Sequence, residues 1–149
     1  MKHKLLGSLF IWICCLTLGM GSMGEPVSVK TPEPDINFRA TVVDQDDVSL
    51  ELEKFSFNGK TYITGKMGKA ELSIDFEKIR SILFVKKDGR ITAMVTLDNQ
   101  QKIEDDQQKI ELFLEQDAPC FGTSSFADVR IAAGDIKSVV IHGTKQEKE

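Results

Sequence analysis

Apolar residues recur at every second position along most of the chain after residue 37, and polar residues fill the positions between them. A period of two predicts β-strands that bury one face. No stretch carries a long apolar repeat of 3.6 residues with helix caps, so the sequence predicts an all-β domain. The clearest runs are Val48, Leu50, Leu52; Ala70, Leu72, Ile74; Ile91, Ala93, Val95, Leu97; Ile110, Leu112, Leu114; and Ala127, Val129, Ile131.

Turn-forming residues separate these runs. They lie at Asp44 to Asp47, Asn58-Gly59, Asp88-Gly89 and Asp98-Asn99. Asn, Asp and Gly tolerate the positive φ of tight hairpin turns. The strongest hairpin signal is Lys87-Asp88-Gly89-Arg90, which has an apolar run on either side.

An internal repeat divides the chain into two units. Residues 70–84 match residues 127–141 at a constant offset of 57, with four identical positions and four more of similar character. The preceding segments match at an offset of 53, so that Ala40 and the run 48–52 correspond to Ala93 and the residues from 101 onward. Each unit is predicted to contain four strands, with a Gly-containing loop after the second.

Two such units can bury their apolar faces against each other. The predicted fold is therefore a sandwich or closed barrel of about eight short antiparallel strands, built from two duplicated four-strand units. Unit one covers about residues 38–86 and unit two about residues 90–142. A seven-residue tandem copy lies inside unit two, where 100–106 is followed by the related 107–111, and we interpret it as an insertion tolerated in an exposed hairpin.

Residues 1–24 have the layout of an export signal. Lys2, His3 and Lys4 give a basic start, residues 5–18 are an apolar run, and small residues follow. We expect cleavage near Gly24, with a second candidate site after Gly21. An uncleaved anchor facing outward is an alternative because residues 5–24 carry no charge. A lipoprotein modified at Cys14 or Cys15 is a third possibility, and all three place the domain outside the cytoplasm, in the periplasm or extracellular space.

Three further segments complete the predicted organisation. Residues 25–36 contain three prolines and few apolar residues, which predicts an extended tether. The all-β domain follows at 37–143, and residues 144–149 form a charged C-terminal tail.

Charge and cysteine content narrow the possible partners. The whole chain is 41% apolar and 28% charged, and the part after residue 24 has 17 basic against 23 acidic residues, a net charge of −6. Such a balance repels a phosphate backbone, so no nucleic acid partner is expected. Only Cys120 remains after cleavage, so an internal disulfide is impossible and the core must supply the stability.

The sequence offers few groups for catalysis. Cys120 and His142 could form a nucleophilic pair, but no Asn or Asp lies at a recognisable spacing to orient the imidazole. The part of the chain after residue 24 has one His and one Cys, which cannot complete a tetrahedral zinc site within one chain. Ser124-Ser125 lacks the glycine pattern of a nucleophile elbow. We therefore predict no enzyme activity, no catalytic residues, no metal and no cofactor.

Two groups of residues offer weaker binding hypotheses. Asp44, Asp46 and Asp47 could take Ca²⁺ at a turn, although acidic residues are ordinary turn formers. Phe55, Phe57 and Tyr62 could form a carbohydrate or partner platform, although alternating Phe residues more often mark a buried strand face.

By elimination, the sequence predicts an exported, non-catalytic β-module that binds or assembles with another component of the cell envelope. The alternative is a barrel that holds a small apolar molecule. That alternative requires Leu72, Ile74, Val129 and Ile131 to line a cavity rather than to fill the core.

Overall fold

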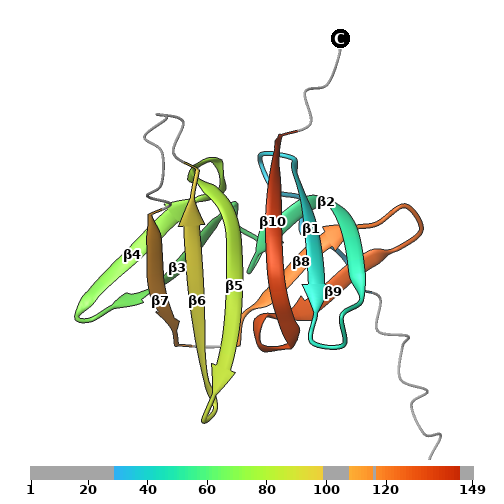
Figure 1. The fold of residues 1–149 in the computed structure, drawn as a ribbon. Helices are drawn as coiled ribbons and strands as arrows, with labels where there is room; N and C mark the ends of the chain where they lie inside the picture. The colour runs from blue at the N-terminus through green and yellow to red at the C-terminus, as the bar shows by residue number, and fades with distance from the viewer. Residues whose placement is uncertain (1–28, 99–107, 116, 145–149) are drawn as a thin grey trace, which may run out of the picture.

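The computed structural model describes residues 29–98, 108–115 and 117–144, and it confirms the all-β class (Figure 1). It contains ten strands rather than about eight, with one 3₁₀ turn before β5 and another before β10. The strands are β1 (Phe38–Asp44), β2 (Ser49–Phe57), β3 (Tyr62–Met67), β4 (Ala70–Asp75), β5 (Ile79–Lys87), β6 (Arg90–Leu97), β7 (Lys109–Leu114), β8 (Pro119–Thr123), β9 (Asp128–Ala132) and β10 (Ile136–Thr144); the 3₁₀ turns are η1 (Phe76–Lys78) and η2 (Ala133–Asp135). The predicted export signal (1–24) lies outside the described residues, as do the first heptapeptide copy and most of the tail.

All ten strands form one curled antiparallel sheet in the order β4-β3-β7-β6-β5-β10-β1-β2-β8-β9. Figure 1 shows the strands in two groups that meet where β5 lies beside β10. We call the strands from β4 to β5 the β5 half and those from β10 to β9 the β10 half. The two sequence units do not stack as separate layers, because β5 and β10 pair directly through their backbones.

The strand order reads the same from both ends when the two sequence units are exchanged. If β1 to β5 are replaced by β6 to β10 and the reverse, the order of strands across the sheet is inverted. Each half therefore combines strands from both units: β7 of unit two pairs with β3 of unit one, and β2 of unit one pairs with β8 of unit two. Ile82 and Val139 correspond to each other in the two units and are direct partners across β5 and β10, so the centre of this symmetry lies between them.

At the two hairpins that begin the units, the pairing registers also correspond. Ala40 opposite Leu52 in β1 and β2 corresponds to Ala93 opposite Leu112 in β6 and β7. The loop hydrogen bonds correspond as well: Asp44 N donates to Val48 O at 3.0 Å, and Leu97 N donates to Gln108 O at 3.1 Å. The second strands of the units thus correspond at an offset of 60, not the 53 predicted, because β7 begins in the second heptapeptide copy.

The two strands that sequence periodicity missed, β3 and β8, replace the predicted Gly-containing loops. Each carries a glycine that faces a leucine of the neighbouring strand. A Cβ on Gly65 would lie 2.9 Å from Leu112 Cβ, and a Cβ on Gly122 would lie 2.8 Å from Leu52 Cβ. Glycine is required at both positions by close approach, which removes the apolar alternation that would have indicated a strand.

The core lies on the inner face of the curled sheet and is filled by aliphatic side chains with a cluster of three phenylalanines. Phe76 in η1 stacks on Phe55 at a centroid distance of 5.4 Å and meets Phe38 edge to face at 5.6 Å. Because η1 precedes β5 whereas Phe38 and Phe55 lie on β1 and β2, this cluster joins the two halves.

The described part of the predicted tether, residues 29–36, lies against the β10 half. Thr31 Oγ1 donates a hydrogen bond to Gly122 O at 3.2 Å, and Glu33 pairs with Lys54 at 2.8 Å. This ion pair lowers the pKa of Glu33 and raises that of Lys54.

Candidate functional site

An open groove of about 760 Å³ lies on the β10 half. Its walls come from β1, β2, the end of β8 with the following turn, and the end of β10. The lining residues are Arg39, Ala40, Glu51, Leu52, Glu53, Thr123, Ser124, Ser125 and His142. Charges of both signs, three hydroxyls and an imidazole thus surround a small apolar floor.

Strand alternation places these polar side chains outward. On β1 the exposed Arg39 alternates with buried Phe38 and Ala40, and on β10 the exposed His142 follows buried Ile141. Thr41 Oγ1 and His142 Nε2 form a hydrogen bond of 2.7 Å between the adjacent strands. This contact fixes the imidazole at the mouth of the groove.

A bulge in β2 shapes the wall that carries Glu53. The register with β8 shifts between Glu53 and Ser56, and Lys54 has a positive φ of 52°. Lys54 N donates to Asn37 Oδ1 at 2.8 Å, which satisfies the backbone donor that the bulge removes from the sheet ladder. Bulges bend a strand and redirect its side chains, and this one directly follows Glu53 in the groove wall.

The opposite wall is a tight turn between β8 and β9. Ser124 N donates to Ala127 O at 2.8 Å, and Ala127 N donates to Ser124 Oγ at 3.1 Å. Thr123 Oγ1 donates to Asp128 Oδ1 at 3.0 Å. The turn holds Phe126 in solvent with 81% of its surface exposed, beside the rim residue Ser125.

The structure separates Cys120 from His142. Cys120 is completely buried on β8, whereas His142 is exposed on β10, with β1 and β2 between them in the sheet. Three strand spacings amount to roughly 14 Å, beyond hydrogen-bond reach. Burial raises the pKa of the Cys120 thiol to about 12, so the nucleophilic thiolate is suppressed at neutral pH.

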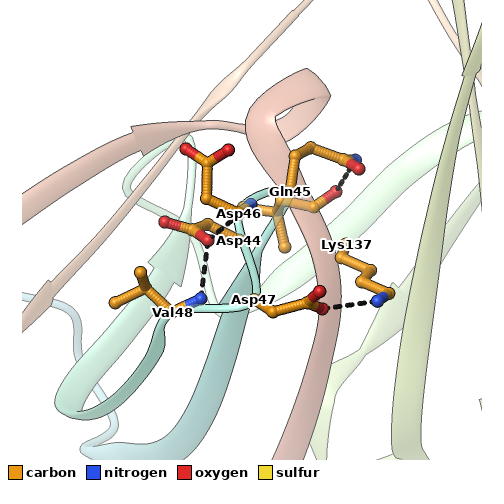
Figure 2. Close-up of polar contacts among 7 residues, drawn as sticks. Asp44, Gln45, Asp46, Asp47, Val48 and Lys137 are labelled. Carbon is orange, nitrogen blue, oxygen red and sulfur yellow. Dashed lines mark hydrogen bonds and ion pairs between the residues drawn. The ribbon is translucent and has the colours of Figure 1, made fainter.

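In the acidic turn between β1 and β2, the carboxylates of Asp44 and Asp47 contact groups of the protein itself (Figure 2). Asp44 Oδ1 accepts hydrogen bonds from the backbone N of Asp46 and of Val48, both at 2.9 Å. Asp47 pairs with Lys137 Nζ at 2.5 Å, and Gln45 Nε2 donates to Ile136 O. The geometry is that of a turn former anchored to β10, and no cluster able to hold a metal ion is found within the described ranges.

The aromatic platform hypothesis is wrong. Phe55 and Phe57 are 1% and 5% exposed and belong to the core, and Tyr62 is half-buried.

The interior residues on which the apolar-ligand alternative depends contribute to the core. Ile74 is buried, and Leu72, Val129 and Ile131 pack against the core cluster. None of the four lines the large groove or a smaller one of about 180 Å³ beside Phe57 and Lys66. In the part of the chain that is described, the structure therefore gives this alternative no support.

The large groove itself was not predicted, because its residues come from four separate segments and none forms a local motif. A signal does exist in the repeat. Thr41 and Glu53 line or border the groove, whereas the corresponding residues of the other half are Met94 and Phe113. The contrast between Glu53 and Phe113 requires the offset of 60, which only the structure provides.

A family model described as "Uncharacterised protein" matches residues 34–144, which span all ten strands. The chain belongs to this family. Neither the curated proteins nor the solved structures include a match. Among the described residues, no helix is long and apolar enough to cross a bilayer.

Proposed function

We propose that this family member is an exported, non-catalytic β-module that binds a polar component of the cell envelope in the groove of the β10 half. The groove carries the proposal: an open site of about 760 Å³ that offers a cation, carboxylates and hydroxyls from four segments held by one sheet. Sites built on rigid strands keep such groups in place for recognition. The buried Cys120 and the distant His142 support a binding role rather than covalent chemistry.

Export is supported by the pattern of residues 1–24, a basic start followed by an apolar run and small residues. N-terminal sequencing of the accumulated protein should begin at Glu25 or at Ser22. Recovery of the intact segment from Met1 in a membrane fraction would instead favour the anchored form.

A photo-crosslinking experiment in intact cells tests the groove. A benzoyl-phenylalanine at position 126 places the reactive group on an exposed aromatic position beside the rim. The matched control is the same group at Lys69, the corresponding residue in the turn between β3 and β4 of the other half. We expect one discrete adduct from position 126 that is absent from position 69.

Groove variants then distinguish specific binding from proximity. Arg39→Ala and Glu51→Gln change exposed side chains, so the fold should persist while the adduct from position 126 falls several-fold. Equal adducts from both positions, or an adduct that neither variant weakens, would refute the groove as the binding site.

We also propose that the two units are copies of one five-strand unit. Of the two halves that these units form, only the β10 half has acquired the groove. The inverted strand order and the corresponding registers support this proposal. Ile74 and Ile131 occupy corresponding positions, opposite Ile63 and Cys120. Truncating Ile74 to Ala should therefore cost about 2 to 5 kcal/mol, and truncating the more exposed Ile131 somewhat less.

A further inference from the structure

The outer face of the sheet carries a patch of large apolar side chains that covers much of the β5 half and continues across the junction onto β10. Its members are 37% to 47% exposed and lie on four adjacent strands: Phe113 on β7, Met94 on β6, Leu83 and Val85 on β5, and Val140 on β10. The register places these side chains in three successive rows of the outer face. Leu83 is directly opposite Met94, and Thr92 lies between Val85 and Phe113 in the next row.

The fold does not require apolar residues at three of these five positions. In the β10 half the residues that correspond to Met94, Val85 and Phe113 are Thr41, His142 and Glu53. The same backbone therefore accepts polar side chains there. Contiguous exposed apolar patches mark interaction surfaces, so the β5 half together with the adjoining strand β10 has a docking face that the remainder of the β10 half lacks.

We propose that this face is the contact surface of a twofold dimer of this chain. A second copy is the occupant whose matching surface is on the molecule itself, because an apolar interface centre requires an apolar partner surface. The polar groove of the β10 half does not match it, so a head-to-tail arrangement is disfavoured and an isologous one favoured.

Charge and size are consistent with this arrangement. Lys109 and Glu111 lie two residues apart on the exposed face of β7, beside the patch. A twofold axis in the face can set the lysine of one copy against the glutamate of the other. The patch spans about 14 Å across the strands and about 13 Å along them, a suitable apolar centre for an interface that buries about 800 Å² per partner with its polar rim.

Sedimentation velocity of the protein in the form that the cell accumulates, from about 1 to 100 μM, tests the proposal. We expect twice the mass of one chain. In the variant Met94→Thr/Phe113→Glu, each new residue is the one found at the corresponding position of the β10 half. This variant should weaken the dimer by about tenfold or more. Circular dichroism checks that the double variant is folded. If the double variant is unfolded, Val85→His, which also introduces the residue of the corresponding position, is measured in its place.

The matched control is Phe126→Ser, which removes an exposed aromatic residue outside the patch and should leave the mass unchanged. A protein that stays monomeric at 100 μM overturns the proposal. So does a dimer that survives the patch variants with the same dissociation constant, or one that Phe126→Ser dissolves instead. The proposal depends neither on export nor on what the groove binds.

Discussion

The β5 half and the β10 half have corresponding interiors and contrasting outer faces. Inside, Ala40 and Leu52 of the β10 half match Ala93 and Leu112 of the β5 half, and all four are at most 2% exposed. Outside, the β10 half has a polar groove, whereas the β5 half has the apolar patch, which ends at Val140 on the adjoining strand β10.

This difference shows which positions the fold constrains. Inward positions face a filled core, where a change of volume creates a cavity or an overlap, so these four positions keep the same sizes in both units. Outward positions face solvent and have no such restriction. They are therefore the positions at which the two halves can take up different functions.

The junction between the halves also differs at its two ends. At one end the aromatic ring of Phe76 packs on Phe38 and Phe55. At the other end the corresponding residue is Ala133, and Gly134 N donates a hydrogen bond of 2.7 Å to Asp117 Oδ1. One junction is thus held by aromatic burial and the other by a small-residue contact and a charge-assisted hydrogen bond.

The largest predicted effect comes from breaking the aromatic junction. Phe76→Ala removes a ring that is 1% exposed and should lower the free energy of unfolding by about 3 to 5 kcal/mol. Asp117→Ala at the other junction should cost only about 1 kcal/mol, because it removes one hydrogen bond near the surface. Urea unfolding measures both, with the exposed Glu77→Ala in the same turn as control. Equal losses at the two junctions would contradict the comparison.

The second effect tests the shared interior. Gly65→Ala and Gly122→Ala each force a methyl group against a leucine Cβ, so each should cost up to about 3 kcal/mol. Ser73→Ala on the exposed side of β4 should change stability little.

A double-mutant cycle identifies the cause of the loss. If the overlap with the Leu52 side chain is responsible, Gly122→Ala combined with Leu52→Gly, which removes the leucine Cβ together with Cγ and Cδ1, should cost clearly less than the sum of the two single changes. Strict additivity would mean that the glycine is required for another reason.

These glycines also explain how far the sequence could predict the fold. Strands with alternating apolar residues, such as β4, β6 and β9, were predicted, as was the Lys87–Arg90 hairpin, where Asp88 and Gly89 both have positive φ. The strands β3 and β8 were missed, because their inward positions include Gly65 and Gly122, whose small size is determined by leucines distant in sequence. Local periodicity does not contain that information.

The direct pairing of β5 with β10 and the groove were beyond prediction for the same reason. Both depend on which strands become neighbours. The apolar alternation of a strand indicates a buried face but not the identity of the strand beside it.

The third predicted effect is a pH dependence of stability that comes from Cys120. This residue corresponds to Ile63 of the other half, and both are 0% exposed. In the folded chain the Cys120 thiol keeps its proton to a pKa of about 12, whereas in the unfolded chain it titrates near 9.0. The unfolded state therefore loses the proton first, and stability from this group falls as pH rises from about 9 to 12. At pH 10.5 the loss should be about 2 kcal/mol.

Cys120→Val isolates this contribution from the other groups that titrate at high pH. Denaturant unfolding at pH 8 and pH 10.5 should show a smaller loss in the variant than in the unchanged protein, by about that amount. Identical pH dependence of the two proteins would show that Cys120 is not held as a buried neutral thiol.

The smallest predicted effect concerns the loop in which the two hairpins differ in length. Deleting residues 100–106 leaves three residues between Leu97 and Gln108, the number found between Asp44 and Val48. The strand β7 begins at Lys109, after the deletion, so its register with β6 can persist. Loop-closure entropy varies only with the logarithm of length, so stability should change by less than about 1 kcal/mol.

A second bond shows why the shortened loop should close without strain. In the β10 half Gln45 N donates to Asp135 O at 2.9 Å, and in the β5 half Asp98 N donates to Lys78 O at 2.8 Å. The shorter loop already accommodates this contact together with the hairpin bond, so both can form in the deletion variant. Urea unfolding of the two forms provides the measurement. A loss of several kcal/mol would mean that the additional heptapeptide contributes structure, and the loop would then be a real difference between the halves instead of a tolerated insertion.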